Sequence, residues 1–275
     1  MIYELDREMF YVIEKLLDVD KCNIEPKSVM EKNNPGWIFV DNPENPKSAL
    51  IWSKGIEGFY VAGDEKNPAF NEHFNEFIDT DIVPRAEKLD LGWFEINGVN
   101  PKWNDVLKEV LKERNLSTWN QYVYKYKKQQ ITAENAPANG NFKIQRIDED
   151  FFESLHVDNM SFVFDILNLF WDSAENFLGK GIGYCAVCGD FIASVCYSSF
   201  ISKNTHAIGI ETEEEFRRKG FGQAAAAEVL KECLNKGFSA YWDCETTNVA
   251  SYKLAEKIGF ERDIEYTCFG FPFNG

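Results

Sequence analysis

The stretch "EFRRKGFGQAAAAEVL", residues 215–230, places three consecutive cations and two glycines in front of an alanine-rich helix. Gly220 and Gly222 allow the backbone to turn with its N–H groups on one side and to approach a ligand closely. The helix adds unpaired N–H donors and the positive end of its dipole. The cations at 217–219 favour a di- or triphosphate over a carboxylate, because each charge-assisted contact contributes about 1.5–3 kcal/mol. The stretch therefore predicts an anion site at the start of a helix.

The sequence around this loop weighs against the simpler interpretation, a solvated basic turn before an ordinary helix. An expected strand, "AIGIET" at 207–212, precedes the loop, and "NVASYKLAEKIGF" at 248–260 follows it. The P-loop motif G-x-x-x-x-G-K-[ST] is absent from the sequence, and the glycines between 179 and 183 lead into an expected strand rather than a helix. The pattern therefore disfavours the common nucleotide-binding folds.

The composition narrows the class of partner. The chain has 275 residues, of which 44% are apolar and 27% charged, as in ordinary globular domains. Its formal net charge of −16 argues against nucleic acid or an anionic membrane as a partner, because both require a basic face. A cationic small molecule would be attracted to such a protein. A role of the acidity in solubility alone fits equally well.

The sequence also predicts a cytoplasmic protein that holds no metal. The opening residues are acidic with helical apolar spacing, unlike a signal peptide, and no window reaches the ~18 apolar residues of a membrane span. Seven cysteines, an odd number, indicate reduced thiols. Cys185 and Cys188 form a C-x-x-C motif on an expected strand, where residues three apart face opposite sides. We therefore expect no metal ion to bind there.

Residues 131–142, "ITAENAPANGNF", are small and polar and contain Pro137 and Gly140, which predicts a linker. The sequence thus predicts an N-terminal domain at 1–130, the linker at 131–142 and a second domain at 143–275. Strands and helices alternate in both halves, which indicates an α/β fold of the mixed α+β kind.

The expected elements of the second half include a hairpin closed by Gly189-Asp190. The segment 92–126 matches 237–271 in the order strand, helix, strand, which predicts a weak internal repeat. Only the second copy has the cationic glycine loop. The expected strands of the second half are 142–147, 181–189, 191–200, 206–212, 239–246 and 265–271, with one or two helices in 148–181 and further helices after 220 and at 249–260.

These motifs together resemble the GNAT superfamily of acyl-CoA N-acyltransferases. The family pattern is a strand, Q/R-x-x-G-x-G/A and a helix, then N-x-x-A-x-x-L-Y-x-x-x-G-F. The matching positions are Arg217, Gly220 and Gly222 in the first motif, and Asn248, Ser251 (in place of alanine), Leu254, Gly259 and Phe260 in the second. The resemblance implies tandem GNAT-like folds, each a central mixed sheet flanked by helices, with a degenerate N-terminal copy and an acetyl-CoA site in the second.

A narrower likeness extends over the whole chain. The stretches "IGIETEEEFRRKGFG", "WDC" and "LAEKIGFERDIEYT" resemble the GNAT subfamily that includes the zwittermicin self-resistance acetyltransferase. Its members carry an additional N-terminal half with stretches like "NPGWIFVDNPENPKSALIWSKGIEGFY". The acceptor of that one member does not transfer to this chain.

The resemblance also implies which residues bind acetyl-CoA. Main-chain groups of Ile210 and Thr212 would hold the pantetheine arm, and the amides of residues 218–223 would surround the pyrophosphate. Asn248 would face the pantetheine arm with Ser251 beside it. The expected cofactor-binding residues are therefore Ile210, Thr212, Arg217, Arg218, Lys219, Gly220, Phe221, Gly222, Gln223, Asn248 and Ser251.

The expected catalytic groups follow from a departure from the family pattern. Ala255 stands where the family commonly has a tyrosine that protonates the departing thiolate. A thiol of pKa about 8.5 leaves as thiolate at a cost of roughly 2 kcal/mol at pH 7, whereas deprotonating an amine of pKa about 10.4 costs roughly 4.6 kcal/mol. A base therefore matters more than an acid. The candidates are Glu211 and His206 as bases and Tyr252 as a replacement acid. The competing interpretations are an exposed strand carboxylate, a surface histidine and a packed aromatic ring.

The sequence thus predicts an acetyl-CoA-dependent N-acetyltransferase. Acetyl-CoA would be the cosubstrate, and the acceptor a primary amine of a small, cationic molecule that attacks directly in a ternary complex. The alternative is a CoA-binding sensor or partner-binding protein with little or no catalysis, which Ala255 favours. The sequence leaves the acceptor, the length of the acyl group and the oligomeric state open.

Overall fold

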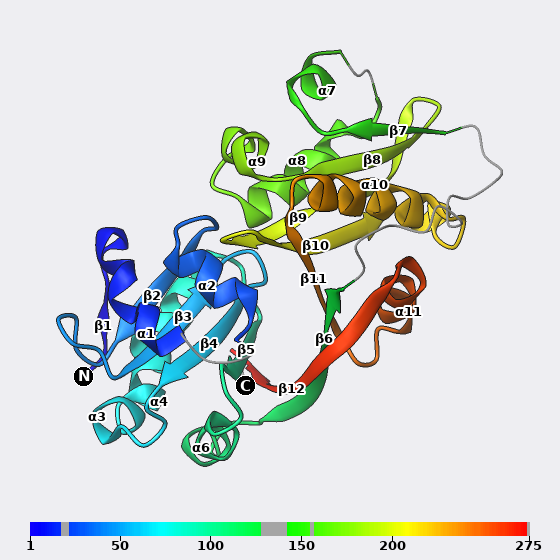
Figure 1. Ribbon diagram of the computed structural model, residues 1–275. Helices are drawn as coiled ribbons and strands as arrows, with labels where there is room; N and C mark the ends of the chain where they lie inside the picture. Colours follow the sequence, from blue (N-terminus) through cyan, green and yellow to red (C-terminus); the bar gives the residue numbers. More distant parts are fainter. Residues whose placement is uncertain (18–21, 128–141, 155–156, 274–275) are drawn as a thin grey trace. The chain divides into compact units, whose positions relative to one another are not determined.

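The computed structural model describes residues 1–17, 22–127, 142–154 and 157–273. It divides into two compact units (Figure 1). The first comprises Met1–Gln121 and Glu265–Gly275, and the second Tyr122–Ile264. The predicted mixed α/β architecture is confirmed, because each unit is a sheet with flanking helices.

The first unit is a mostly antiparallel sheet with helices packed on both faces. Strands β4 and β5 pair in parallel. The strands, in order across the sheet, are β1 (Tyr3–Glu4), β2 (Gly36–Val40), β3 (Ser48–Ser53), β4 (Gly58–Gly63), β5 (Trp93–Gly98), the second half of β12 (Phe260–Pro272) and the first half of β6 (Ser117–Tyr126). The helices are η1 (Arg7–Ile13), α1 (Glu14–Leu17), α2 (Ile24–Met30), α3 (Pro68–Asn71), α4 (Phe74–Phe77), η2 (Ile78–Ile82), α5 (Val83–Lys88) and α6 (Trp103–Val110).

The second unit contains the cationic glycine loop. Its strands, in order across the sheet, are the first half of β12, the second half of β6 (Ser117–Tyr126), β11 (Ser239–Glu245), β10 (Thr205–Thr212), β9 (Phe191–Ser202), β8 (Gly183–Cys188) and β7 (Lys143–Arg146). The helices are α7 (Glu149–Ser154), α8 (Met160–Phe170), α9 (Ala174–Lys180), η4 (Glu214–Phe216), α10 (Phe221–Asn235) and α11 (Val249–Ile258). The described residues of the segment 148–181 thus form three helices where one or two were predicted, and Ser173 caps the last of them by accepting a hydrogen bond from the Asn176 amide.

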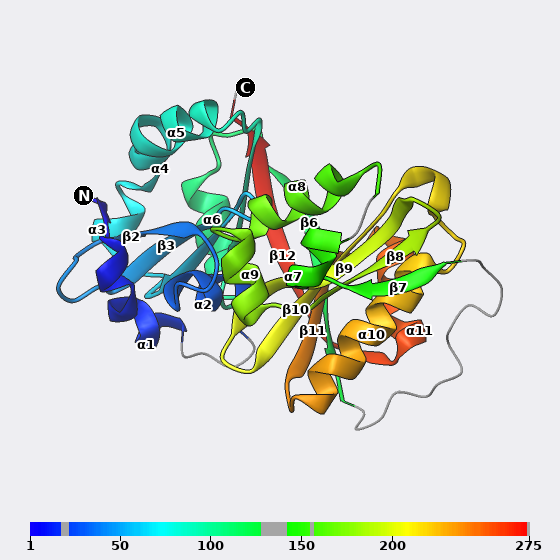
Figure 2. The same cartoon turned by 90° about the horizontal axis from the view of Figure 1, so that it is seen from above.

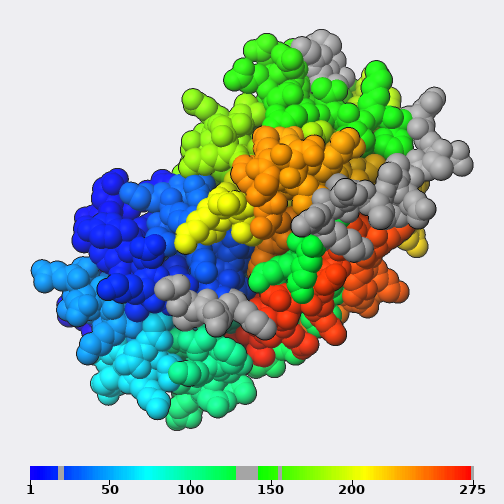
Figure 3. Space-filling view, viewed as in Figure 1, coloured from blue at the N-terminus to red at the C-terminus, as the bar shows by residue number. Residues whose placement is uncertain are grey.

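Helices cover opposite faces of the strands β8–β10 (Figure 2). Helix α10 packs on one face together with Ile208, Ile210 and Trp242. Helices α8 and α9 pack on the other face with Val195 and Tyr197. Because neighbouring residues of a strand point to opposite sides, each position of β10 belongs either to the α10 face or to the α8 face. The outer surface of α10 is visible in orange in Figure 3.

The compact units differ from the predicted domain boundaries at the last strand of each half. Residues 122–126 of β6 lie in the second unit although they precede the linker, and residues 265–272 of β12 lie in the first. Strand pairing between segments far apart in the sequence causes the difference, and no local pattern encodes such pairing. The predicted linker, 131–142, lies outside the described residues except for Phe142.

Strand β6 supplies core aromatic residues to the second unit. Tyr124 is 1% exposed, and its hydroxyl donates to Glu256 of α11 at 3.1 Å. Tyr126 packs edge-on against Phe260.

We therefore expect a fragment of residues 143–264 to be less stable than a fragment of residues 122–264 by at least about 3 kcal/mol, the usual cost of losing one large buried aromatic side chain. Chemical denaturation of both fragments measures this difference. Equal unfolding midpoints would show that β6 is dispensable for the second unit.

Candidate active site

Strands β10 and β11 separate next to the cationic loop. Their parallel pairing covers only Thr205–Ala207 against Ser239–Tyr241. Strand β10 runs on to Thr212 and stays paired with β9 over its whole length. The two strands visibly diverge in Figure 1. The edge of β10 beyond Ala207 is therefore not covered by β11.

The backbone groups on this uncovered edge can be assigned. The Glu213 amide donates to the Ala193 carbonyl, and the Ser194 hydroxyl donates to the Glu211 carbonyl, so residues 211 and 213 direct their backbone groups towards β9. Because these directions alternate along a strand, Ile210 and Thr212 direct theirs towards the uncovered edge. These are the two residues expected to bind the pantetheine arm.

Ser194, which the sequence analysis did not single out, fixes the end of β10. Its hydroxyl lies 2.8 Å from Thr212 Oγ1 in addition to its contact with Glu211. Ser194 is fully buried. The signal in the sequence was a polar residue in the otherwise apolar start of "FIASVCYSSF".

The cationic loop holds its backbone in the left-handed region twice. Arg218 has φ 62° and Gly220 has φ 90°, an unusual conformation for a non-glycine residue such as Arg218. The Arg217 guanidinium donates from Nε to the Thr212 carbonyl at 3.1 Å. The Lys219 ammonium lies 5.4 Å from the ring centre of Phe216. Arg217, Arg218 and Lys219 are all exposed, so their charges remain available to a ligand.

The start of α10 has the features of an anion site. Gly220 is the N-cap residue and offers no side-chain cap. The first intrahelical hydrogen bond runs from the Ala224 amide to the Gly220 carbonyl, so the amides of Gly220, Phe221 and Gly222 precede the helical ladder. The positive end of the helix dipole lies at the same place. Gln223, the last expected pyrophosphate residue, follows in this first turn.

Gly222 has a packing role that the sequence analysis missed. A Cβ at this position would lie 2.9 Å from Ile210 Cδ1, 3.1 Å from Thr212 Oγ1 and 3.3 Å from Ser194 Oγ. The glycine therefore lets α10 approach β9 and β10 closely.

The second motif acts at the start of α11. The Asn248 side chain caps this helix by accepting from the Ser251 amide at 3.1 Å. The Ser251 hydroxyl accepts from Trp242 Nε1 at 2.9 Å and thereby ties α11 to β11. Both side chains thus have structural partners, and their predicted contacts with the pantetheine arm stay predictions.

Tyr252 lies on the side of β11 that is away from β10. Its ring packs edge-on against Tyr122 of β6, 6.1 Å between centres, and β6 and β10 flank β11 on opposite sides. Ala255, one turn later, is fully buried between α11 and the sheet. This arrangement favours the packed-aromatic interpretation of Tyr252 over the acid role.

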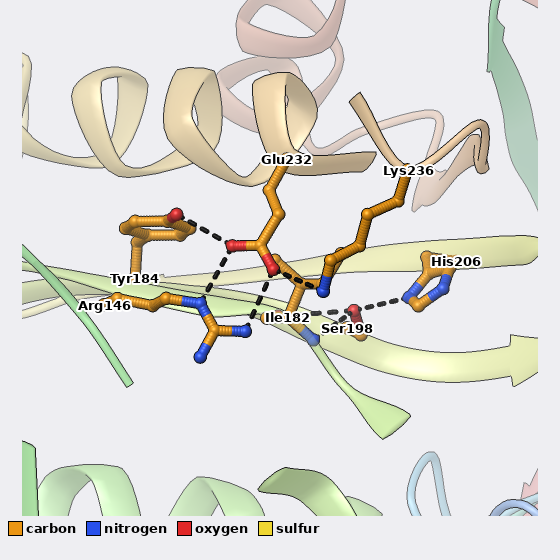
Figure 4. A network of polar contacts seen from close by, with 7 residues as sticks. All are labelled: Arg146, Ile182, Tyr184, Ser198, His206, Glu232 and Lys236. Atoms are coloured by element: carbon orange, nitrogen blue, oxygen red, sulfur yellow. Dashed lines mark hydrogen bonds and ion pairs between the residues drawn. The ribbon is translucent and has the colours of Figure 1, made fainter. Parts of the chain in front are cut away.

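His206 is not the surface histidine that the sequence analysis considered as the alternative. It is 2% exposed, its ring stacks on Phe238 at 4.6 Å, and Nδ1 lies 2.9 Å from the Ser198 hydroxyl (Figure 4). Burial is the main cause that lowers the pKa of His206 to about 4, and the positive charge of Lys236 adds to this shift. The negative charge of Glu232 opposes the shift. The residue lies beside the C-terminal end of α10, whereas the cationic loop lies at the N-terminal end. Its burial disfavours direct contact with an acceptor.

The neighbouring carboxylate of Glu232 is held by three partners from different elements (Figure 4). Arg146 donates to it twice at 2.9 Å, the Tyr184 hydroxyl at 2.8 Å and Lys236 at 2.8 Å. The hydrogen bond from Arg146 is the largest of the effects that lower the pKa of Glu232 to about 2. This network ties β7 and β8 to α10.

We expect His206 to make stability depend on pH. The folded protein favours neutral histidine, with a pKa of about 4 against 6.5 in the unfolded chain, so its contribution is fully present above pH 6.5 and is lost as the pH falls towards 4. Between pH 7.5 and 4.5 the wild type should lose about 2–3 kcal/mol of unfolding free energy through this group. The variant His206→Gln should lose that much less over the same interval in urea denaturation. Parallel pH profiles would contradict this assignment.

Glu211 occupies the α8 face next to the uncovered edge of β10. It lies directly opposite Val195, whose side chain is part of the core beneath α8. The residue reaches solvent, yet the protein around its carboxyl withdraws it partly from water, which raises its pKa, and the Arg217 charge opposes this effect. A carboxylate of raised pKa is a stronger base. Of the two candidate bases, Glu211 is the exposed one.

The comparisons with known proteins identify the family. The family model for GNAT acetyltransferases matches residues 14–269. The chain is 26% identical over 270 residues to the uncharacterized N-acetyltransferase YdfB of Bacillus subtilis (strain 168), covering 98% of each. The chain belongs to the GNAT acetyltransferase family and is an N-acetyltransferase by class.

Two solved structures have a similar fold. The GCN5-related N-acetyltransferase-like protein of Streptococcus suis 89/1591 aligns with a TM-score of 0.66 at 21% identity, over 95% of this chain and 98% of that one. A tandem GNAT protein from the clavulanic acid biosynthesis pathway aligns with a TM-score of 0.64 at 11% identity, over 99% and 98%. At these identities the likeness concerns the fold, and the tandem arrangement predicted from the sequence is confirmed.

Among residues 1–17, 22–127, 142–154 and 157–273, no three histidine, cysteine or acidic side chains are arranged to hold a metal ion. None of the helices in these same ranges has the length and hydropathy of a membrane span.

Proposed function

We propose that this protein transfers an acetyl group from acetyl-CoA to a primary amine of a small, cationic molecule by direct attack. One observation carries the proposal: the uncovered edge of β10 leads into a cationic, left-handed loop at an uncapped helix start. Such a combination offers backbone hydrogen bonds to an extended amide-containing chain and an anion site at its end.

The residues present fit acetyl-CoA. The amides of residues 218–223 and the charges of Arg218 and Lys219 would hold the pyrophosphate. Backbone groups of Ile210 and Thr212 would hold the pantetheine arm, and Arg217 would give up its contact with the Thr212 carbonyl. Asn248 and Ser251 would border the arm from the start of α11. Acetyl-CoA supplies the activated acyl group.

The chemical step requires a base more than an acid. Glu211 would take a proton from the acceptor ammonium, the nitrogen would form a bond to the acetyl carbon, and the carbon–sulfur bond would break with its electron pair leaving on sulfur. The nitrogen then loses a second proton and the sulfur gains one, which yields an amide and a thiol. His206 is the alternative base and Tyr252 the alternative acid, although the burial of the first and the packing of the second favour neither.

Direct attack is favoured over an acyl-enzyme on a cysteine. Two cysteines lie close to this region. Cys196 of β9, directly opposite Ile210, is fully buried, and burial raises its pKa well above its usual value. Cys244 of β11 is 8% exposed, and burial raises its pKa to about 11 despite the hydrogen bond with Ser251. Little thiolate would exist at neutral pH, and the thiolate is the nucleophilic form. Cys244 is best explained as a core residue.

The charge of the protein supports a cationic acceptor. The chain carries a net charge of −16, and the exposed carboxylates of Glu211, Glu214 and Glu215 lie close to the uncovered edge of β10 in sequence. A field of this sign raises the local concentration of cations.

All seven cysteines are unpaired in the described residues, which supports a reducing compartment such as the cytoplasm. We also propose that the chain belongs to the GNAT subfamily that includes the zwittermicin self-resistance acetyltransferase.

A second candidate function is a CoA-binding protein with little or no catalysis. The buried Ala255 favours it, because that position carries no acid. Release of free CoA thiol from acetyl-CoA, measured with the full chain and a panel of primary amines, separates the two. The proposal requires amine-dependent release above the uncatalysed rate. Binding of acetyl-CoA without release for any amine would support the second candidate.

A further inference from the structure

The side chain of Tyr197 crosses strand β10 on the α8 face. Tyr197 belongs to β9 and lies directly opposite Gly209 of β10. A Cβ on Gly209 would lie 2.6 Å from Tyr197 Cζ and 2.9 Å from its hydroxyl oxygen, so the ring occupies the space of the missing side chain. The phenol therefore extends from β9 across β10 in the direction of β11, where the edge of β10 is uncovered.

The side chain of Tyr197 is 2% exposed, and no hydrogen bond joins its hydroxyl to another described residue, yet this hydroxyl is not among the fully buried side-chain atoms that lack a partner. Phe170 of α8 packs on the ring at 5.4 Å and offers no polar group. The hydroxyl therefore lies beside the uncovered edge of β10 without a bond to the described residues, where it can bind a ligand.

The neighbouring charged group is Glu211, two residues after Gly209 and on the same face of β10. Burial, followed by the negative charge of Glu211, raises the pKa of Tyr197 well above its usual value. The phenol is therefore neutral at physiological pH, and its oxygen can accept a hydrogen bond. A carboxylate and a phenol oxygen then lie on one face beside the uncovered edge.

We propose that the Tyr197 hydroxyl is a second contact for the acceptor nitrogen, beside Glu211, and that the pair selects primary over secondary amines. This inference rests on the proposed function. It assigns a binding role to Tyr197 and a permissive role to Gly209, whose missing side chain allows the phenol to reach the strand edge.

The number of N–H groups on the acceptor nitrogen explains the selectivity for primary over secondary amines. A primary ammonium has three N–H groups, and after one proton passes to Glu211 two remain while the nitrogen lone pair attacks. One remaining N–H is directed at Glu211 and the other at the Tyr197 oxygen. A secondary amine retains only one N–H at this stage, so one of the two protein oxygens is left without a partner. A buried polar group without a partner is what rejects the wrong substrate.

The test compares matched amines on the full-length protein. Cadaverine, spermidine, lysine amide and tryptamine are each assayed beside the derivative in which every primary amine is N-methylated, with acetyl-CoA in excess. The variant Tyr197→Phe should lower kcat/KM for the primary amines roughly 10-fold and change that for the N-methyl amines little. Its unfolding free energy should stay within about 0.5 kcal/mol of wild type, because no hydrogen bond is removed from the described structure.

Tyr184→Phe is the control, because it removes a tyrosine hydroxyl from the neighbouring strand β8 that is bonded to Glu232 instead. It should lower stability and leave the ratio of primary to secondary rates unchanged. A second variant, Gly209→Ala, should displace the Tyr197 ring and lower the same ratio.

The outcomes separate the inference from the proposed function. If wild type acetylates primary amines and Tyr197→Phe keeps the wild-type ratio, the role of Tyr197 is refuted while the proposed function stands. If wild type acetylates none of the four primary amines although it binds acetyl-CoA, the proposed function fails and the inference fails with it.

Discussion

The variant Gly220→Asp is expected to bind acetyl-CoA at least about 100-fold more weakly than wild type. Gly220 is the N-cap of α10 with φ 90°, and its neighbours supply the amides and cations of the proposed pyrophosphate site. An aspartate there brings a negative charge against the anion and removes close backbone approach. Charge-assisted contacts contribute about 1.5–3 kcal/mol each, so the loss of one or two suffices for this effect. Calorimetry measures the dissociation constant.

Matched variants separate charge from strain in this experiment. Gly220→Ala has the same left-handed backbone without the charge. The difference in dissociation constant between the two variants therefore measures the repulsion between the aspartate and the bound anion. Lys219→Ser should weaken binding roughly 10-fold or more, whereas Lys231→Ser, near the other end of α10 and paired with Glu228, should have little effect. Removing a negative charge by Glu214→Gln should not weaken binding. Wild-type affinity in folded Gly220→Asp would refute the phosphate assignment.

The variant Glu211→Gln is expected to lower turnover at neutral pH by at least tenfold, since general bases contribute about 10²–10⁴ in rate. The deficit should shrink at high pH, where the amine is already neutral. Because partial burial raises the pKa of Glu211, wild-type turnover should rise with pH as this carboxyl ionises, and this limb should be absent in the variant. Steady-state rates across pH give both profiles.

Glu213→Gln is the matched control, because Glu213 lies two residues further along and accepts from Asn159 at 3.4 Å. It should retain the wild-type profile. Tyr252→Phe should cost less than Glu211→Gln, since the Tyr252 ring packs against β6. Identical pH profiles for wild type and Glu211→Gln would refute the base role and return His206 to consideration.

The sequence predicted the local elements of the second unit well. The hairpin at Gly189-Asp190, the strand that ends at Thr212 and the helix after Gly220 all appear as expected. These elements depend on glycine conformations, strand alternation and a helix start, each of which is encoded within a few residues. The expected site around 210–223 likewise came from one continuous stretch.

The pairing of the last strands could not be predicted in this way. The second half of β6 joins the second unit and most of β12 the first, because partners distant in the sequence complete each sheet. At the N-terminus, the helical apolar spacing of the opening residues corresponds to a short strand β1, the 3-10 helix η1 and one turn of α1. Tertiary pairing of β1 with β2 overrides the helical spacing there.

The sequence contained a signal for the contact at Gly209, although the sequence analysis did not use it. Gly209 stands inside an apolar strand, and a glycine in that context often marks a close approach of another group. Here that group is Tyr197. The burial of His206 required the structure, because Phe238, Lys236 and Ser198 come from three separate segments.

The central claim, direct transfer of acetyl from acetyl-CoA to a primary amine, is tested most directly with an isotope-labelled acetyl group. The full chain, labelled acetyl-CoA and a primary amine are mixed, and mass spectrometry follows the amine and the protein over one turnover. The account predicts label in the N-acetyl amine in step with free CoA, and none on the protein at any time. Label that appears first on Cys244 and then passes to the amine, or bound acetyl-CoA with no labelled amine above the uncatalysed background, would contradict it.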